Sequence, residues 1–131
     1  MIDAERPSIF AVLSERLRFL SARTSVIAEN IANSDTPDYA ARDLKKPEFA
    51  HRVSTALKVS NPRHIAGAQR LAAARFDVEA APDPEAALNG NQVSIETQMM
   101  KLSETRMDYQ LASTIYRKGV ELVRLAARGG R

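Results

Sequence analysis

The chain has 131 residues, with 19 Lys and Arg against 16 Asp and Glu, and this length suits one domain or one unit of an assembly. It has no cysteine, which excludes disulfides, thiolate metal sites and cysteine nucleophiles. No stretch approaches the roughly 20 apolar residues that a membrane-spanning helix needs.

Residues 1–37 are expected to form a long helix, from Ser8 to Asn33, and the signal that ends it. Pro7 and Ser8 suit a helix start, because Pro is tolerated in the first turn and Ser can cap. Apolar residues then alternate at spacings of 3 and 4, a heptad pattern with Thr24 as its polar member. This N-terminal seam consists of Phe10, Leu13, Leu17, Leu20, Ile27 and Ile31. The residues from Asn33 to Pro37 favour caps and turns, so they predict the helix end.

Residues 38–91 lack a consistent period and contain four of the six prolines, so we expect a loose, partly extended middle segment. The pattern allows a short helix over His64–Ala74 and a brief strand over Phe76–Val78. A small hairpin is compatible with it. Asp83–Gly90 is expected to be a loop, because it leads into the turn-forming Asn89-Gly90-Asn91.

Residues 92–131 are expected to form the second long helix, from Ser94 to Ala127. Ser94 is a suitable N-cap, and Glu96 in the first turn complements the helix dipole. Apolar residues again alternate at 4 and 3, and a second stripe runs beside them in the latter half. The C-terminal seam comprises Ile95, Met99, Leu102, Tyr109, Tyr116, Val120 and Val123, and the second stripe Leu111, Ile115, Leu122 and Leu125.

The pattern as a whole predicts a mainly α fold, in which the long N- and C-terminal helices pack as a coiled-coil-like hairpin. At 1.5 Å per residue the helices would be about 39 and 51 Å long, longer than the roughly 28 Å diameter of a compact globule of this size. Such a hairpin leaves apolar stripe exposed. Two interpretations remain open: a subunit that completes its core with neighbours, and an ordinary helical hairpin in a small monomeric domain.

The chemistry-bearing residues form no recognisable catalytic, cofactor or metal site. His51 and His64 lack a metal-ligand spacing, and no nucleophile elbow or phosphate-binding glycine loop is present. We therefore expect no enzyme activity. The carboxylates of the second helix are expected to be exposed or paired nearby: Glu96, Glu104 and Asp108, with Lys101 and Arg106. The formal charge of +3 leaves one alternative function, a basic helical-hairpin adaptor or nucleic-acid-binding module.

The segment from Ala28 to Tyr39 carries the most specific motif. It resembles the signature of the flagellar axial family of rod, hook and hook-junction proteins, whose first helix ends in Asn-x-x-Asn followed by Thr-Pro-Gly-Tyr. The matching residues are Asn30, Ile31, Ala32, Asn33, Asp35, Thr36, Pro37 and Tyr39. Asp38 stands where the family has Gly, and Asp tolerates a left-handed turn better than most residues. The stretches Ala41–Leu44 and Gly90–Val93, with the short middle, favour the proximal rod members.

The resemblance implies a structural subunit of the proximal rod, in which packed terminal helices assemble and transmit torque from the motor. It implies export through the flagellar type III apparatus without a cleaved signal, and residence in the periplasmic rod of the basal body. Its partners would be other copies, other rod proteins, the inner-membrane ring and export-gate or ring-adaptor proteins, with no nucleic acid and no membrane span. At the helix end, we expect the Asn30 and Asn33 amides to satisfy terminal carbonyls, and Asp35 or Thr36 to bond nearby N–H groups.

Overall fold

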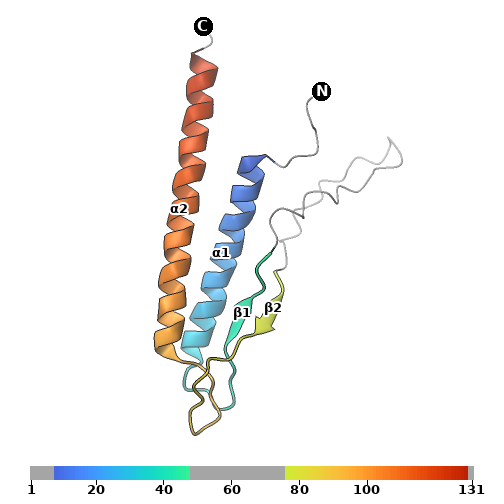
Figure 1. Cartoon of the computed structure of the whole chain (residues 1–131), viewed down its shortest axis with the longest axis vertical. Coiled ribbons are helices and arrows are strands. Elements are labelled where there is room, and N and C mark those ends of the chain that lie inside the picture. Colours follow the sequence, from blue (N-terminus) through green and yellow to red (C-terminus); the bar gives the residue numbers. More distant parts are fainter. Residues whose placement is uncertain (1–7, 48–75, 130–131) are drawn as a thin grey trace, which may run out of the picture.

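The fold is a helical hairpin with a small two-stranded ribbon beside it (Figure 1). The computed structural model describes residues 8–47 and 76–129. Within these ranges the elements are α1 (Ile9–Ala32), β1 (Arg42–Leu44), β2 (Val78–Ala80) and α2 (Ile95–Arg128). The predicted mainly α hairpin is confirmed. The short helix expected over His64–Ala74 lies outside the described residues.

Both helices begin directly after the serines that were predicted to cap them, Ser8 and Ser94. The Ser8 hydroxyl accepts a hydrogen bond from the Ala11 N–H at 3.2 Å, and the Ser94 hydroxyl accepts one from the Thr97 N–H at 3.4 Å. Each bond satisfies an amide that a helix start would otherwise leave unpaired. Neither helix is both long enough and apolar enough to cross a membrane, over the residues that the structure describes.

The ribbon is antiparallel, and Asp43 lies opposite Glu79 in its centre. The strand expected over Phe76–Val78 was placed about two residues too early, since β2 starts at Val78. Phe76 instead packs its ring edge-to-face against Phe19 of α1, with 5.2 Å between ring centroids. Together with Leu20 and Leu44, this contact forms the hydrophobic core, which therefore lies between α1 and the ribbon.

The face of α2 that packs against α1 carries small and polar side chains. Gln98, Thr105 and Ala112 are buried at seven-residue intervals, and Gly119 continues the series. A Cβ atom on Gly119 would lie 2.9 Å from Cε1 of Phe10, so the glycine makes room for that ring. The small residues allow the two helices to approach closely. Tyr116 of α2 also packs edge-to-face on Phe10, with 5.6 Å between ring centroids, but most of the large apolar residues of α2 lie on its other faces.

We predict that Gly119→Val lowers the free energy of unfolding by about 1–3 kcal/mol, because the added methyl groups displace the Phe10 ring at a packed contact. Urea unfolding followed by circular dichroism measures the change. Thr114→Val, an exposed position of the same helix, is the control and should change the value little. Equal stability of Gly119→Val and the wild type would show that this contact contributes nothing.

Candidate assembly surface

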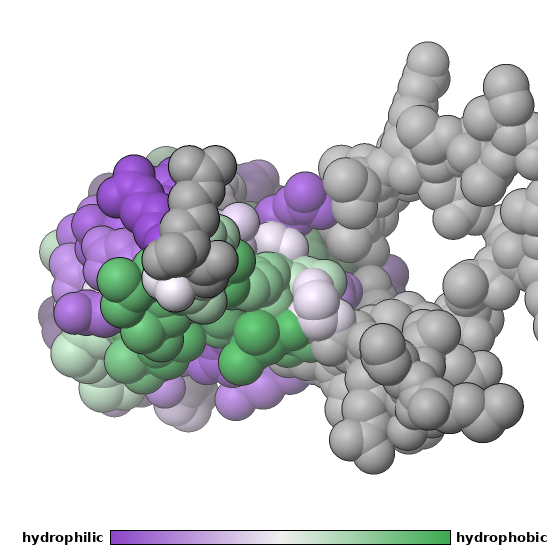
Figure 2. Space-filling view, turned by 90° about the horizontal axis from the view of Figure 1, so that it is seen from above, coloured by the Kyte–Doolittle hydropathy of each residue, from purple (hydrophilic) through white to green (hydrophobic). Residues whose placement is uncertain are grey.

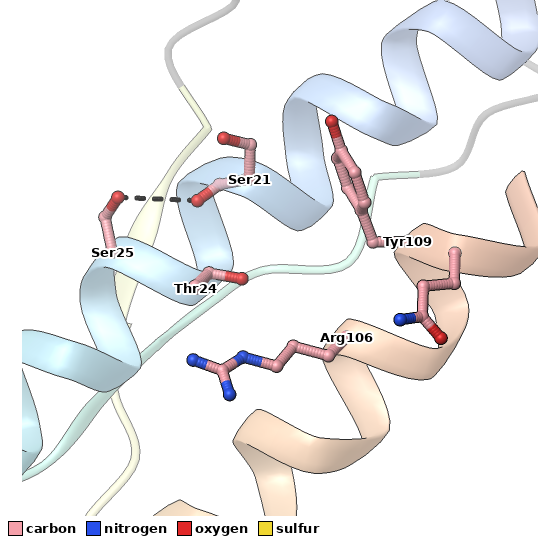
Figure 3. Close-up of a pocket in the computed structure, with 6 residues that line it drawn as sticks. Ser21, Thr24, Ser25, Arg106 and Tyr109 are labelled. Atoms are coloured by element: carbon pink, nitrogen blue, oxygen red, sulfur yellow. Dashed lines mark hydrogen bonds between the residues drawn. The ribbon is translucent and has the colours of Figure 1, made fainter. Parts of the chain in front are cut away.

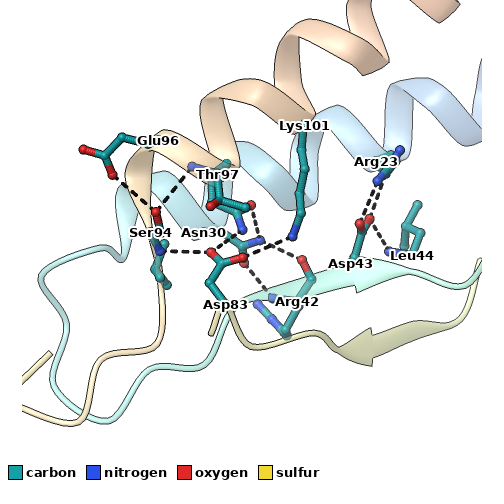
Figure 4. Close-up of polar contacts among 12 residues, drawn as sticks. Arg23, Asn30, Arg42, Asp43, Leu44, Asp83, Ser94, Glu96, Thr97 and Lys101 are labelled. Carbon is teal, nitrogen blue, oxygen red and sulfur yellow. Dashed lines mark hydrogen bonds and ion pairs between the residues drawn. The ribbon is translucent and has the colours of Figure 1, made fainter. Parts of the chain in front are cut away.

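The side chain of Asn30 joins three elements at the end of α1 (Figure 4). It is fully buried, and its amide nitrogen donates to the Arg42 carbonyl at 2.7 Å and to Oε1 of Gln98 at 2.9 Å. Its oxygen accepts from the Arg42 N–H at 3.0 Å and from the Tyr39 hydroxyl at 3.3 Å. The expectation that Asn30 caps terminal carbonyls of its own helix is therefore wrong, because its amide is used to hold β1 and α2.

Asp83 extends this network from the loop that precedes α2. One carboxylate oxygen accepts from Nε2 of Gln98 and from the Ser94 N–H, both at 2.9 Å, and the other lies 3.3 Å from Nζ of Lys101. Burial alone would raise the pKa of the Asp83 carboxyl, but these donors outweigh it and hold the pKa below its ordinary value. Asn30, Asp83, Gln98 and Lys101 together form what we call the buried polar network. Lys101 pairs with Asp83 here, and Glu96 and Glu104 of its own helix are exposed, which is one of the two outcomes expected for them.

Asn91, which lies outside the motif, caps the end of α1. Its buried amide donates to the carbonyls of Asn33 and Thr36, at 2.9 and 2.7 Å. Asn33 does bond a terminal carbonyl as expected, that of Glu29 at 2.8 Å. The Thr36 hydroxyl donates to the Asn33 side chain at 3.1 Å, whereas a bond to a backbone N–H had been expected.

Asp38 adopts the left-handed conformation, with φ of 58°, at the position where the family pattern has Gly. Its N–H donates to the Asn89 carbonyl at 3.2 Å, which places it beside the turn that contains Gly90. Gly90 has φ of 78°, and a Cβ atom there would collide with the Asp38 carboxylate. The two turns therefore fit together because the second contains a glycine.

Within the described residues, three ion pairs tie α1 to its neighbours, and one of them joins Glu29 to Arg42 of β1. Arg23 donates to both carboxylate oxygens of Asp43 at 2.8 Å, and both side chains are largely buried. Burial raises the pKa of Asp43, but the hydrogen bonds from the Arg23 guanidinium and the Leu44 N–H lower it by more. The pKa of Asp43 therefore lies below its ordinary value. Arg16 pairs with Asp108 of α2 at 3.1 Å, in place of the expected Lys101 or Arg106. This pair is more than one-third exposed, so it contributes little stability.

The apolar positions singled out in the sequence do not share one environment. Three groups are found. Leu20 and Ile27 are buried; Phe10, Leu13, Leu17, Ile31, Leu102, Tyr116 and Val120 are half-buried; Ile95, Met99, Tyr109, Leu111, Ile115 and Val123 are exposed. The first two groups hold the hairpin and its ribbon together, whereas the third is free for other contacts.

One apolar surface of α2 lies away from the residues that pack on α1. We call it the outer stripe, and its side chains are between 61% and 68% exposed. It consists of Met100, Met107, Leu111, Leu122 and Leu125. Met100 and Met107 belong to neither of the apolar seams predicted from the sequence. The seven-residue spacing of Gln98, Thr105, Ala112 and Gly119 could have identified them. Met100 and Met107 follow the first two of these residues by two positions, which places them on the opposite side of the helix.

A groove of about 360 Å³ runs between the helices at mid-height (Figure 3). It is lined by Ser21, Thr24, Ser25, Arg106, Tyr109 and Gln110. Ser25 uses its hydroxyl to bond the Ser21 carbonyl of its own helix at 3.4 Å. Across the described residues, no group of three or more His, Asp or Glu side chains is placed to hold a metal ion. The groove resembles a space between packed helices more than a catalytic pocket.

Comparison with known proteins gives consistent matches. The family model described as flagella basal body rod protein matches residues 10–39. The chain is 31% identical to the flagellar basal body rod protein FlgB of Salmonella typhimurium, over 77% of this chain and 79% of the relative. It is 32% identical to that of Escherichia coli, over 75% and 77%. The protein of the same name from Borreliella burgdorferi is 28% identical over 94% of this chain and 98% of its own length.

We predict that Asn30→Ala lowers the free energy of unfolding by about 2–4 kcal/mol, because it leaves the Gln98 oxygen and both backbone groups of Arg42 without their partner. Asn33→Ala removes two exposed hydrogen bonds, one to the Glu29 carbonyl and one from the Thr36 hydroxyl, and should cost only about 0.5–1.5 kcal/mol. Chemical denaturation of both variants tests the difference. Equal losses would mean that Asn30 has no special position in the fold.

We predict that acid lowers the stability of the fold through Asp83 and Asp43. Asp83 and Asp43 have lowered pKa values in the folded chain, so in acid the unfolded chain binds more protons. Their contribution to stability is present above about pH 4 and is lost as the pH falls through the folded pKa values. Unfolding measured from pH 6 downward should show Asp83→Asn and Asp43→Asn each removing part of this slope. A double variant that keeps the full slope would contradict the assignment.

Proposed function

Because this chain belongs to the FlgB family of flagellar basal body rod proteins, we propose that it self-assembles through its terminal helices and transmits torque. The family makes it a structural protein of the rod and not an enzyme. In this proposal the chain has three segments. Residues 1–37 and 92–131 form the rod core, and residues 38–91 are the middle segment between them. The adaptor or nucleic-acid-binding alternative gives way to the family assignment.

The observation that carries self-assembly is the outer stripe of α2. Burying its five side chains would contribute roughly 5–10 kcal/mol, after allowing for the area that is already covered. The entropic cost of association is itself about 4–15 kcal/mol. The two are of the same order, so one such contact gives a weak pair. A stable rod then requires each subunit to contact several neighbours, as in a helical assembly.

Torque transmission requires a stiff subunit, and the packing of the hairpin supports that part of the proposal. The buried polar network joins α1, the loop before α2 and α2 itself, and Arg23 with Asp43 joins α1 to β1. Sliding one helix along the other would break Asn30–Gln98 and leave two buried amides unpaired, which is costly. The hairpin therefore resists shear along its long axis.

The proposed location and partners follow from the same family. We place the subunit in the proximal, periplasmic part of the rod, after export through the type III apparatus without a cleaved signal. Its neighbours there would be further copies, other rod proteins, the inner-membrane ring and export-gate or ring-adaptor proteins. Recovery of tagged protein with purified basal bodies would test the location. Cross-linking the tagged protein within those basal bodies would identify its neighbours.

We predict that Leu111→Asp blocks incorporation into the rod while the isolated chain keeps its helicity. Leu111 is 61% exposed in the single chain, so a charge there costs the monomer little, but it would be buried unpaired in an interface. Gln110→Asp, the exposed neighbouring position outside the stripe, is the control. Both are expressed in cells that lack the wild-type protein.

The measurements are swimming motility and the amount of each variant in isolated basal bodies. We expect Gln110→Asp to support both and Leu111→Asp to support neither. Intact, functional rods that contain Leu111→Asp would overturn the assembly role of the outer stripe.

A further inference from the structure

The turn that precedes α2 contains Asn89-Gly90, the one asparagine–glycine pair in the chain. In such a pair the backbone nitrogen of the glycine can attack the side-chain amide carbon of the asparagine, because glycine has no Cβ atom to shield that nitrogen. The other four asparagines precede bulkier residues, and one of them, Asn61, precedes a proline, which has no N–H. By sequence, Asn89 is therefore the asparagine most open to this attack.

The reaction releases ammonia and can lengthen the backbone. The Gly90 nitrogen loses its proton and forms a bond to Cγ of Asn89, and the side-chain nitrogen leaves with a proton as ammonia. A cyclic imide results, and a water molecule then opens it at either carbonyl. Opening at Cγ gives aspartate. Opening at the main-chain carbonyl gives isoaspartate, in which the backbone runs through Cγ with an additional carbon atom and the former peptide carbonyl becomes a free carboxylate.

The folded chain holds this pair in hydrogen bonds, although both residues are exposed to water. The Gly90 N–H donates to the Ala87 carbonyl at 3.0 Å. The Asn89 carbonyl accepts from the Asp38 N–H at 3.2 Å, and the Asn89 side-chain oxygen accepts from the Asn91 N–H at 3.1 Å. Attack would have to release the Gly90 nitrogen and turn the Asn89 side chain away from its partner. Hydrogen bonding, and not burial, therefore opposes the reaction here.

This turn is in addition fixed to the closed end of the hairpin, where α1 ends and α2 begins (Figure 1). The Asn91 amide donates to the carbonyls of Asn33 and Thr36, at 2.9 and 2.7 Å. Gly90 lies so close to Asp38 that a Cβ atom would collide with its carboxylate. An additional backbone atom between positions 89 and 90 would therefore displace the turn or the Asn91 cap.

We propose that Asn89 is a site of spontaneous deamidation, open in the unfolded chain and protected by the closed end of the folded hairpin. A chain that stays unfolded for long modifies itself at this position. Isoaspartate then prevents the closed end from forming as it does in the unmodified chain. The modification thus distinguishes chains that folded promptly from chains that did not. This inference does not depend on the proposed self-assembly.

Incubation of the full chain at mildly alkaline pH, folded in buffer or unfolded in guanidinium chloride, tests the protection. Released ammonia gives the rate, and mass spectrometry of proteolytic peptides locates the change. We expect modification at Asn89 to be at least tenfold faster in the unfolded chain, and faster there than at Asn33, which precedes Ser34. Asn89→Gln, whose longer side chain would have to close a larger ring, is the control and should release little ammonia. Equal rates in the two states, or another asparagine reacting first, overturn the proposal.

Two variants separate protection by the turn from the stability of the whole fold. Asn91→Ala removes the two bonds to the end of α1 and should raise the folded rate several-fold, while the rate in denaturant stays unchanged. Gly119→Val acts at the opposite end of the hairpin, where Gly119 packs on Phe10 and apolar residues gather, as Figure 2 shows from above. This control should leave the rate at Asn89 near that of the wild type. Equal acceleration by both variants would overturn local protection.

The consequence of the modification is tested on chains aged in denaturant, returned to buffer and separated by chromatography. An isoaspartate-specific methyltransferase identifies the isoaspartate form, which we expect to unfold at a lower urea concentration than the unmodified chain. Asn89→Asp adds the same charge without the additional backbone atom and keeps an oxygen for the Asn91 N–H, so it should unfold close to the wild type. An isoaspartate form as stable as the unmodified chain, or Asn89→Asp as unstable as that form, would contradict the role given to the backbone.

Discussion

The hydrogen bond between the amides of Asn30 and Gln98 sets the register of the two helices. A heptad pattern of apolar residues repeats every seven positions, so by itself it would allow one helix to slip along the other by two turns. A buried amide permits no such slip, because any other register leaves it without a partner. Asp83 and the Arg42 backbone satisfy the remaining groups, so the network is complete at one alignment only.

This alignment determines which face of α2 remains available. In the register that Asn30 fixes, Thr105, Ala112 and Gly119 follow Gln98 toward α1, and none of the three is large. Most of the bulky residues of α2 consequently lie on other faces, and the outer stripe is exposed over most of the helix length. An isolated hairpin would gain stability from the reverse arrangement. The arrangement found is that of a subunit whose largest apolar contacts are made with other chains.

Several features of the fold and site could be predicted from local sequence. Ser8 and Ser94 mark helix starts through their own hydroxyls, and Asn33 bonds a carbonyl of its own last turn, because each of these contacts spans only a few residues. The partners predicted for Asn30 and Asp108 were wrong for one shared reason. Each was assigned a partner nearby in the chain, whereas the actual partner lies on another element.

The sequence by itself determined the two helices, their antiparallel hairpin and, through the motif that ends at Tyr39, the family, because periodicity, caps and motifs are local properties. The tertiary structure alone decided which apolar residues are shared between the helices and which face outward. Both sets follow heptad spacing, so periodicity cannot distinguish them. The distinction comes from a hydrogen bond between residues 68 positions apart, which no local pattern encodes.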